Sequence, residues 1–210
     1  MRRIVLALCA LTAVAGCTVK TDPPIADDVF EAATYRHDGP PSLTLYTMIN
    51  NRTGNGAHAS LMVNASQRVI FDPAGSFRKH NIVARGDVVY GVTPHLEDSY
   101  RRFHARETYH VIVQELEVSP EVAEMALQMV MTYGEVPDSM CTRSTSEILA
   151  QLPGLNINTT WFPKNLSEQF ETLPNVTTGK FYEYDDEDRF KALAAYDPEK
   201  VRANMREFGH

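Results

Sequence analysis

The sequence predicts an α+β fold in which a small antiparallel sheet packs against helices. The first observation is a series of β-rich segments between residues 42 and 72, separated by turn residues such as "NASQ" at 64–67. The second is a pair of amphipathic helical patterns at 119–133 and 137–154. Strands and helices are therefore segregated along the chain rather than alternating, and this segregation is typical of the α+β class.

The N-terminal residues have the pattern of a secretory signal peptide. Arg2 and Arg3 precede an apolar run over residues 4–14, which is too short to span a membrane. The run ends in "VAGC" at residues 14–17, and this ending resembles the lipobox of bacterial lipoproteins. A generic signal peptide with a chance cysteine is the alternative.

The lipobox resemblance implies how the chain is processed and where it resides. Residues 1–16 are expected to be the signal peptide, and Cys17 is expected to become the lipidated first residue, carrying acyl chains such as palmitate. Thr18 stands where an aspartate would favour inner-membrane retention. For a Gram-negative source, we therefore expect a lipoprotein anchored at the periplasmic face of the outer membrane.

Charge and cysteine content narrow the function classes. The net charge is −7, and removing residues 1–16 makes it more negative, which argues against a nucleic-acid partner. Of the three cysteines, Cys9 leaves with the signal peptide and Cys17 takes the lipid. Cys141 then remains as a lone thiol, so an internal disulfide is excluded and a reactive thiol is indicated.

The first part of the domain is expected to be a tether followed by a hairpin. Residues 17–41 form the lipidated N-terminus and tether, with a short helix around 26–34, and residues 42–210 form the domain. The segments 42–50, 58–63 and 68–72 are predicted strands, the last two joined by the turn at 64–67.

The remaining elements are predicted in chain order. A strand at 87–94 precedes a helix at 95–106 and a strand at 108–118. Ser119 and Pro120 begin the next helix, and Asp138 or Ser139 caps the one after it, which ends at Pro153. A short strand at 177–184 and a C-terminal extension of charged helices at 186–196 and 198–208 complete the chain.

Three side chains have the chemistry of a nucleophilic site. Cys141 lies in the first turn of its predicted helix, where unpaired N–H groups and the helix dipole stabilise a thiolate. His58 stands at the start of one strand of the hairpin, and Asp72 ends the other, so both side chains can lie on one face. An imidazole between a thiol and a carboxylate can move a proton.

The segments "AHASLMV", "RVIFDPAG" and "MCTRSTSEIL" occur in an order that resembles the circularly permuted branch of the NlpC-type papain-like superfamily, which includes relatives of lecithin:retinol acyltransferase. The resemblance covers roughly residues 42–165. It implies a papain-like fold in which Cys141 attacks a carbonyl, His58 acts as base and then acid, and Asp72 orients His58. The family's third residue is commonly a histidine, so Asp72 departs from the pattern.

The implied activity is that of a cysteine amidase or peptidase, hence a thiol-protease-type hydrolase, or an acyltransferase acting on an amide or ester. The expected substrates are peptides of the cell-wall peptidoglycan, or a lipid or small amide. The alternative is a non-catalytic envelope binding or scaffold lipoprotein that retains the fold, with Cys141, His58 and Asp72 as structural residues.

No cofactor and no metal ion are expected from the sequence. The remaining candidate ligands lack zinc-like spacing: His80, His95, His104 and His110. The acidic run at 183–189 lacks the spacing and the glycine of an EF-hand loop, and no G-x-S-x-G motif occurs.

Overall fold

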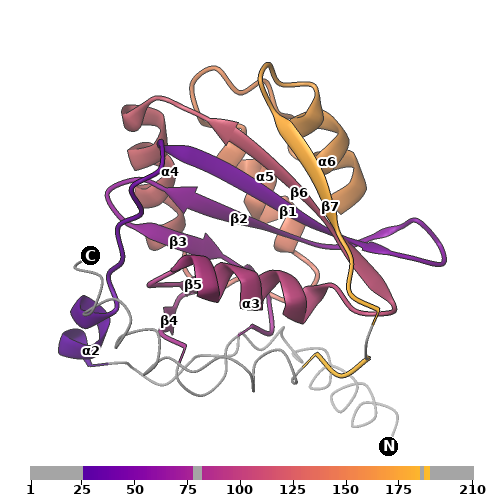
Figure 1. The fold of residues 1–210 in the computed structure, drawn as a ribbon. Helices are drawn as coiled ribbons and strands as arrows, with labels where there is room; N and C mark the ends of the chain where they lie inside the picture. Colours follow the sequence, from indigo (N-terminus) through magenta and orange to yellow (C-terminus); the bar gives the residue numbers. More distant parts are fainter. Residues whose placement is uncertain (1–25, 78–81, 185–186, 190–210) are drawn as a thin grey trace, which may run out of the picture.

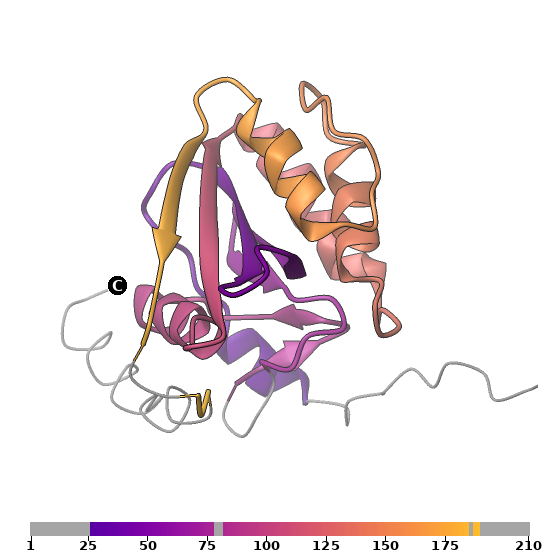
Figure 2. The same ribbon diagram turned by 90° about the vertical axis from the view of Figure 1, so that its right-hand side faces the viewer.

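A seven-stranded antiparallel sheet with helices on both faces forms the body of the protein (Figures 1 and 2). The computed structural model describes residues 26–77, 82–184 and 187–189. The predicted class, α+β with an antiparallel sheet, is confirmed, although the sheet is larger than expected. The signal segment at 1–16, Cys17 and the C-terminal helices predicted at 186–196 and 198–208 lie wholly or largely outside the described residues.

The strand order is β4-β5-β3-β2-β1-β6-β7. The strands are β1 Ser42–Asn50, β2 Gly56–Asn64, β3 Arg68–Phe71, β4 Ala84–Arg85, β5 Val88–Val89, β6 Tyr109–Glu117 and β7 Thr177–Phe181. The helices are α2 Asp27–Ala32, α3 Pro94–His104, α4 Pro120–Tyr133, α5 Cys141–Leu149 and α6 Pro163–Glu171.

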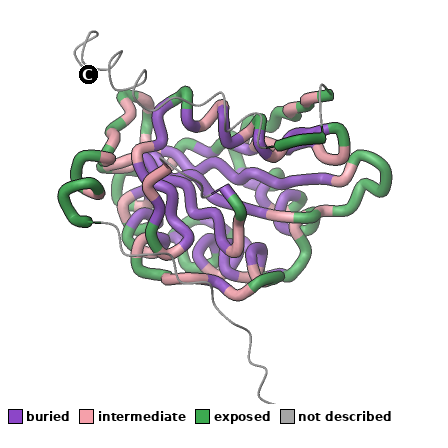
Figure 3. Tube along the Cα trace, turned by 90° about the horizontal axis from the view of Figure 1, so that it is seen from below, coloured by how far each residue is buried: buried purple, intermediate pink, exposed green. Residues whose placement is uncertain are grey.

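Helices cover the two faces of the sheet unequally. Figure 2 shows α4, α5 and α6 together on one face and α3 on the other. Alternate side chains of β1 accordingly enter two cores: Leu43 and Leu45 join the core beneath α4–α6, whereas Tyr46 and Met48 join the core beneath α3. The central strands are buried along most of their length, as the purple tube in Figure 3 shows.

Helix starts follow side-chain capping where the chain supplies it. Ser119 accepts a hydrogen bond from the Val122 N–H at the start of α4, as the sequence predicts. The helix predicted at 95–106 begins at Pro94, because the Thr93 hydroxyl accepts from the Leu96 N–H.

Three expectations differ from the structure. The strand predicted at 87–94 is reduced to β5. It starts at Val88 because Gly86 and Asp87 adopt positive φ angles of 56° and 63° and form a two-residue hairpin turn, and it ends at Val89, two residues before Gly91 with a φ of 68°. The predicted caps of α5 are wrong: the N-cap is Met140, which supplies no side-chain hydrogen bond, and the preceding Ser139 has a φ of 72°. The third difference is α6, for which no helix was predicted.

Candidate active site

His58 and Asp72 meet across the β2–β3 hairpin. Leu61 pairs with Phe71 in this ladder, so its continuation places Asp72 opposite Ser60 and diagonal to His58. The His58 Nε2 lies 2.8 Å from the Asp72 Oδ1. The structure thus brings together two of the three residues that the sequence singled out.

The Asp72 carboxylate is fully buried and held by a short hydrogen-bond chain. The Tyr100 hydroxyl, on α3, lies 2.8 Å from the Asp72 Oδ1 and 2.6 Å from the Ser60 Oγ. Because tyrosine has one hydroxyl proton, Tyr100 donates to the carboxylate and Ser60 donates to Tyr100. Burial alone would raise the pKa of Asp72, but the hydrogen bond and charge of His58, with Tyr100, hold it well below its usual range.

Cys141 is the first residue of α5, and this helix packs against β2. The thiol interacts with the His58 ring and with the backbone N–H of Ala59. Burial raises the pKa of the Cys141 thiol, but the hydrogen bond and positive charge of His58 outweigh burial and lower this pKa to about 7. The Cys141 residue is 9% exposed.

The imidazole of His58 therefore lies between a carboxylate and a thiol. Its Nε2 is engaged by Asp72, which leaves Nδ1 for the sulfur. Burial disfavours the charged ring, but the hydrogen bonds to Asp72 and Cys141 raise the pKa of His58 above its ordinary value. The arrangement stabilises a thiolate beside an imidazolium, the form in which cysteine attacks a carbonyl carbon.

His104, on α3, is a site residue that the sequence reasoning did not place here. Its ring stacks on that of His58, with ring centroids 5.9 Å apart and an interplanar angle of 14°. Burial lowers the pKa of His104 to about 4, so the ring is neutral near pH 7. The available signal was the spacing of Tyr100 and His104, which are one helical turn apart on the face of α3 that covers the sheet.

The other histidines do not join this group within the described residues. His110 lies with its Nδ1 2.6 Å from the Asn51 Oδ1 and stacks on Tyr182. His95 is exposed near the start of α3, and His80 lies outside the described residues. Ligand atoms of His58, Asp72 and His104 all lie within 4.8 Å of one another, so these residues form a possible metal-binding group.

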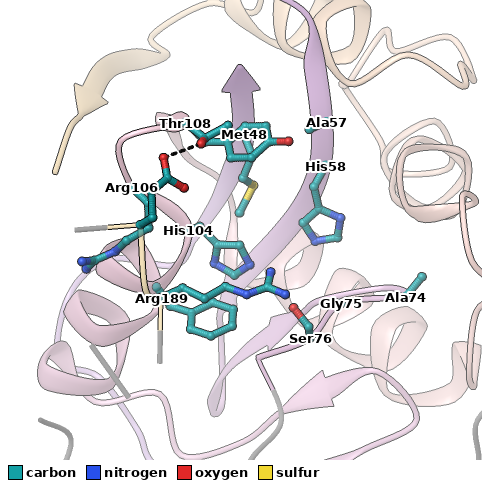
Figure 4. Close-up of a pocket in the computed structure, with 13 residues that line it drawn as sticks. Met48, Ala57, His58, Ala74, Gly75, Ser76, His104, Arg106, Thr108 and Arg189 are labelled. Atoms are coloured by element: carbon teal, nitrogen blue, oxygen red, sulfur yellow. Dashed lines mark hydrogen bonds between the residues drawn. The ribbon is translucent and has the colours of Figure 1, made fainter. Parts of the chain in front are cut away.

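A pocket of about 370 Å³ opens beside the two stacked imidazoles (Figure 4). Its wall includes His58, His104 and the turn residue Gly75 but not Cys141, so it adjoins the histidine rather than the sulfur. The remaining lining residues are Met48, Ala57, Ala74, Ser76, Phe103, Arg106, Thr108, Tyr109, Glu187 and Arg189.

Asp87 connects the two loops that carry the site. Its carboxylate Oδ2 accepts hydrogen bonds from the Ala74 N–H at 3.0 Å and the Val136 N–H at 2.8 Å. Its main-chain carbonyl accepts from the Asp72 N–H at 2.8 Å. The turn after β3 and the loop before Cys141 are therefore tied to one residue of the β4–β5 hairpin.

Comparisons with known proteins give no relative: no family model, no curated protein and no solved structure matches the chain. Among residues 26–77, 82–184 and 187–189, no helix has the length and apolar character needed to cross a membrane.

Proposed function

We propose that the protein is a cysteine hydrolase or acyltransferase that cleaves an amide or ester. The observation that carries this proposal is the position of His58, hydrogen-bonded to Asp72 through one ring nitrogen and interacting with Cys141 on its other side. Burying the charges of Asp72 and His58 is costly, and a structural thiol that stays neutral would gain no stabilisation from either charge.

The proposed reaction begins with attack of the Cys141 thiolate on the substrate carbonyl carbon. The bond to the leaving amine or alcohol breaks, and the His58 imidazolium gives that group its proton, which leaves a thioester on Cys141. His58, now neutral, takes a proton from water or from an acceptor alcohol or amine, whose oxygen or nitrogen attacks the thioester carbon. The C–S bond then breaks, the acid, ester or amide product leaves, and the thiolate–imidazolium pair is regenerated. Asp72 keeps the His58 ring oriented and stabilises its charge.

The fold assigned in this proposal is a permuted papain-like domain. Its support is the order of the elements: the histidine strand β2 and the carboxylate-bearing β3 come before the helix α5 that begins with the nucleophile. As part of the same proposal, lipidated Cys17 anchors the enzyme at the periplasmic face of an outer membrane. Peptidoglycan peptides are then the nearest substrates, with a lipid or small amide as the other class.

A binding or scaffold lipoprotein is the second candidate, favoured by the 9% exposure of Cys141 and its absence from the pocket wall. In such a protein the pocket beside His58 would bind a ligand without turnover.

The experiment that separates the candidates is mass spectrometry of the intact protein after incubation with an activated ester and with purified muropeptides. A hydrolase gives a transient acyl adduct on Cys141, and muropeptide fragments that the Cys141→Ala variant does not produce. The His110→Ala variant, altered at a histidine outside the site, serves as the matched control and should behave as wild type. The enzyme proposal is overturned if the wild-type protein and Cys141→Ala give identical spectra with every substrate class.

A further inference from the structure

The group formed by His58, Asp72 and His104 has the donor atoms of a zinc site. Its ligand atoms lie within 4.8 Å of one another, and they comprise two imidazole nitrogens and a carboxylate oxygen. Two histidines and one carboxylate are a common protein ligand set for Zn²⁺, with a further position open to water or substrate. The mechanism proposed above uses His58 and Asp72 but leaves His104 without a role.

The surroundings of these residues fix their ligand atoms. The His104 Nδ1 lies 2.9 Å from the Tyr100 carbonyl oxygen, so its N–H is donated there and Nε2 keeps a free lone pair. Metal-binding histidines characteristically donate their second N–H to a backbone carbonyl or carboxylate in this way. The Tyr100 hydroxyl, one turn before His104 on α3, donates to the Asp72 Oδ1 and so fixes the orientation of that carboxylate.

The second oxygen of Asp72 is an independent indication of a ligand. Asp72 is fully buried, yet its Oδ2 accepts no hydrogen bond within the part of the chain that the structure describes. A buried carboxylate oxygen without a partner is costly, and an ion that it could bind would remove that cost. The oxygen lies against Gly75, a residue of the pocket wall, and the pocket offers a route of entry and room for a water ligand.

We propose that His58, Asp72 and His104 bind a Zn²⁺ ion, entering from the pocket, and that this ion prevents His58 from transferring protons in the reaction. An imidazole whose Nε2 lone pair coordinates zinc carries its proton on Nδ1 and can still donate a hydrogen bond to the thiolate. It cannot give that proton to a leaving group, because the ring would then become an imidazolate. The inhibition rests on the proposed function, whereas the binding of zinc does not.

The test is calorimetric titration of ZnCl₂ into the purified protein and into its Cys141→Ser variant, which lacks the nucleophile. We expect one ion per chain with the same affinity in both proteins and in His110→Ala. His104→Ala should weaken binding by more than about 100-fold, because loss of even an outer-shell partner costs about 10–100-fold. Co²⁺ in place of Zn²⁺ should give a ligand-field spectrum without thiolate charge transfer.

Three results would overturn the site: no zinc binding to wild type, zinc binding that is unchanged in His104→Ala, or binding that is lost in Cys141→Ser, which would place the ion on the thiol. Should His104→Ala fail to fold, Tyr100→Phe provides the second variant, with an expected loss of about 10–100-fold. Zinc should also slow acyl-enzyme formation from the muropeptide amide in wild type but not in His104→Ala, and equal rates with and without zinc in wild type would overturn the inhibition. The two proposals fail separately. Without zinc binding, an acyl-enzyme would still support the hydrolase or acyltransferase, and without an acyl-enzyme, zinc binding would still support the metal site.

Discussion

His58 and Asp72 are diagonal neighbours at the end of the β2–β3 ladder, with the ring Nε2 2.8 Å from the carboxylate Oδ1. The ladder ends at the Leu61–Phe71 pair, two residues from Ala59 on β2. Backbone N–H groups of alternate residues point to the same side of a strand, so the Ala59 N–H faces the same side as that of Leu61. Because Ala59 lies beyond the end of the ladder with β3, its N–H donates to the Cys141 sulfur instead. The end of this short hairpin therefore supplies both the imidazole and a backbone donor to the thiol.

The first prediction concerns the acidity of the thiol. Iodoacetamide labelling of Cys141 should reach half its maximal rate near pH 7, because the lowered pKa of Cys141 is about 7. In His58→Ala the midpoint should move to about 8.5 or above, the value for a free or apolar-buried cysteine. His110→Ala should label as wild type does. A midpoint that His58→Ala leaves in place would contradict the role given to His58.

The second prediction concerns the charge of Asp72. Asp72→Asn keeps the shape of the side chain but removes the charge that orients and stabilises the imidazolium. The rate of acyl-enzyme formation should fall at least about 100-fold. The labelling midpoint of Cys141 should also rise, because the pKa of His58 falls without the Asp72 charge and the ring then stabilises the thiolate less. Equal rates in the two proteins would assign the carboxylate a structural role only.

The same variant gives a stability test with a defined sign. The pKa of Asp72 is depressed in the folded protein, so its ionised form stabilises the fold fully above about pH 4, the unfolded value. That contribution is lost as the pH falls toward the folded-state pKa. Urea unfolding should therefore show a difference between wild type and Asp72→Asn that is largest near neutral pH and narrows below about pH 4. A constant difference would be inconsistent with the depressed pKa.

Gly75 carries the third prediction, because a side chain there has no room. A Cβ at this position would lie 1.8 Å from the Asp72 Oδ2, and the buried carboxylate cannot move aside without leaving His58. Gly75→Ala should reduce acyl-enzyme formation about 100-fold, as displacement of a catalytic group by about 1 Å does. It should also destabilise the protein by about 1–3 kcal/mol.

Gly179→Ala on β7 is the matched control, since a Cβ there meets nothing within 4 Å. Both variants are compared by urea unfolding and by labelling kinetics. If Gly75→Ala behaved like Gly179→Ala, the close packing of Gly75 on the carboxylate would affect neither the stability nor the reaction.

Local sequence patterns were sufficient to predict the strands and helices with strong periodicity or caps. The β1, β2 and α4 segments have apolar runs bounded by turn residues or by Ser119, and the structure places them where these signals lie. The predicted meeting of His58 and Asp72 needed only a hairpin and the alternation of side chains.

The features of the fold and the site that the sequence did not predict depend on contacts between distant segments. The strand predicted at 87–94 keeps only Val88 and Val89. Asp87, whose left-handed conformation its two loop contacts stabilise, turns the chain before them, and Gly91 has a φ of 68° two residues after them. The start of α5 lacks a side-chain cap, so no local signal marks Met140. His104 reaches the site because α3 packs on the face of the sheet opposite α4–α6, where its ring stacks on that of His58, and the spacing along the chain does not reveal this packing (Figure 2).

Asp87 carries the last prediction, as a positioning residue that touches none of the proposed reacting atoms. Its carboxylate joins the N–H groups of Ala74 and Val136, and so fixes the Asp72 turn relative to the loop that leads into Cys141. Asp87→Ala leaves two N–H groups without an acceptor and should cost about 2 kcal/mol or more in the free energy of unfolding. Asp87→Asn keeps an acceptor oxygen and should recover most of that loss.

The readout that separates positioning from stability alone is the labelling of Cys141 under conditions where the variants are fully folded. If Asp87 aligns the two loops, Asp87→Ala raises the labelling midpoint above about pH 7, because the thiol and His58 separate, and Asp87→Asn restores it. A purely structural residue would lower the unfolding midpoint in urea and leave the pH profile of the folded protein unchanged. The β4–β5 hairpin would then support the fold without setting the geometry between the thiol and the imidazole.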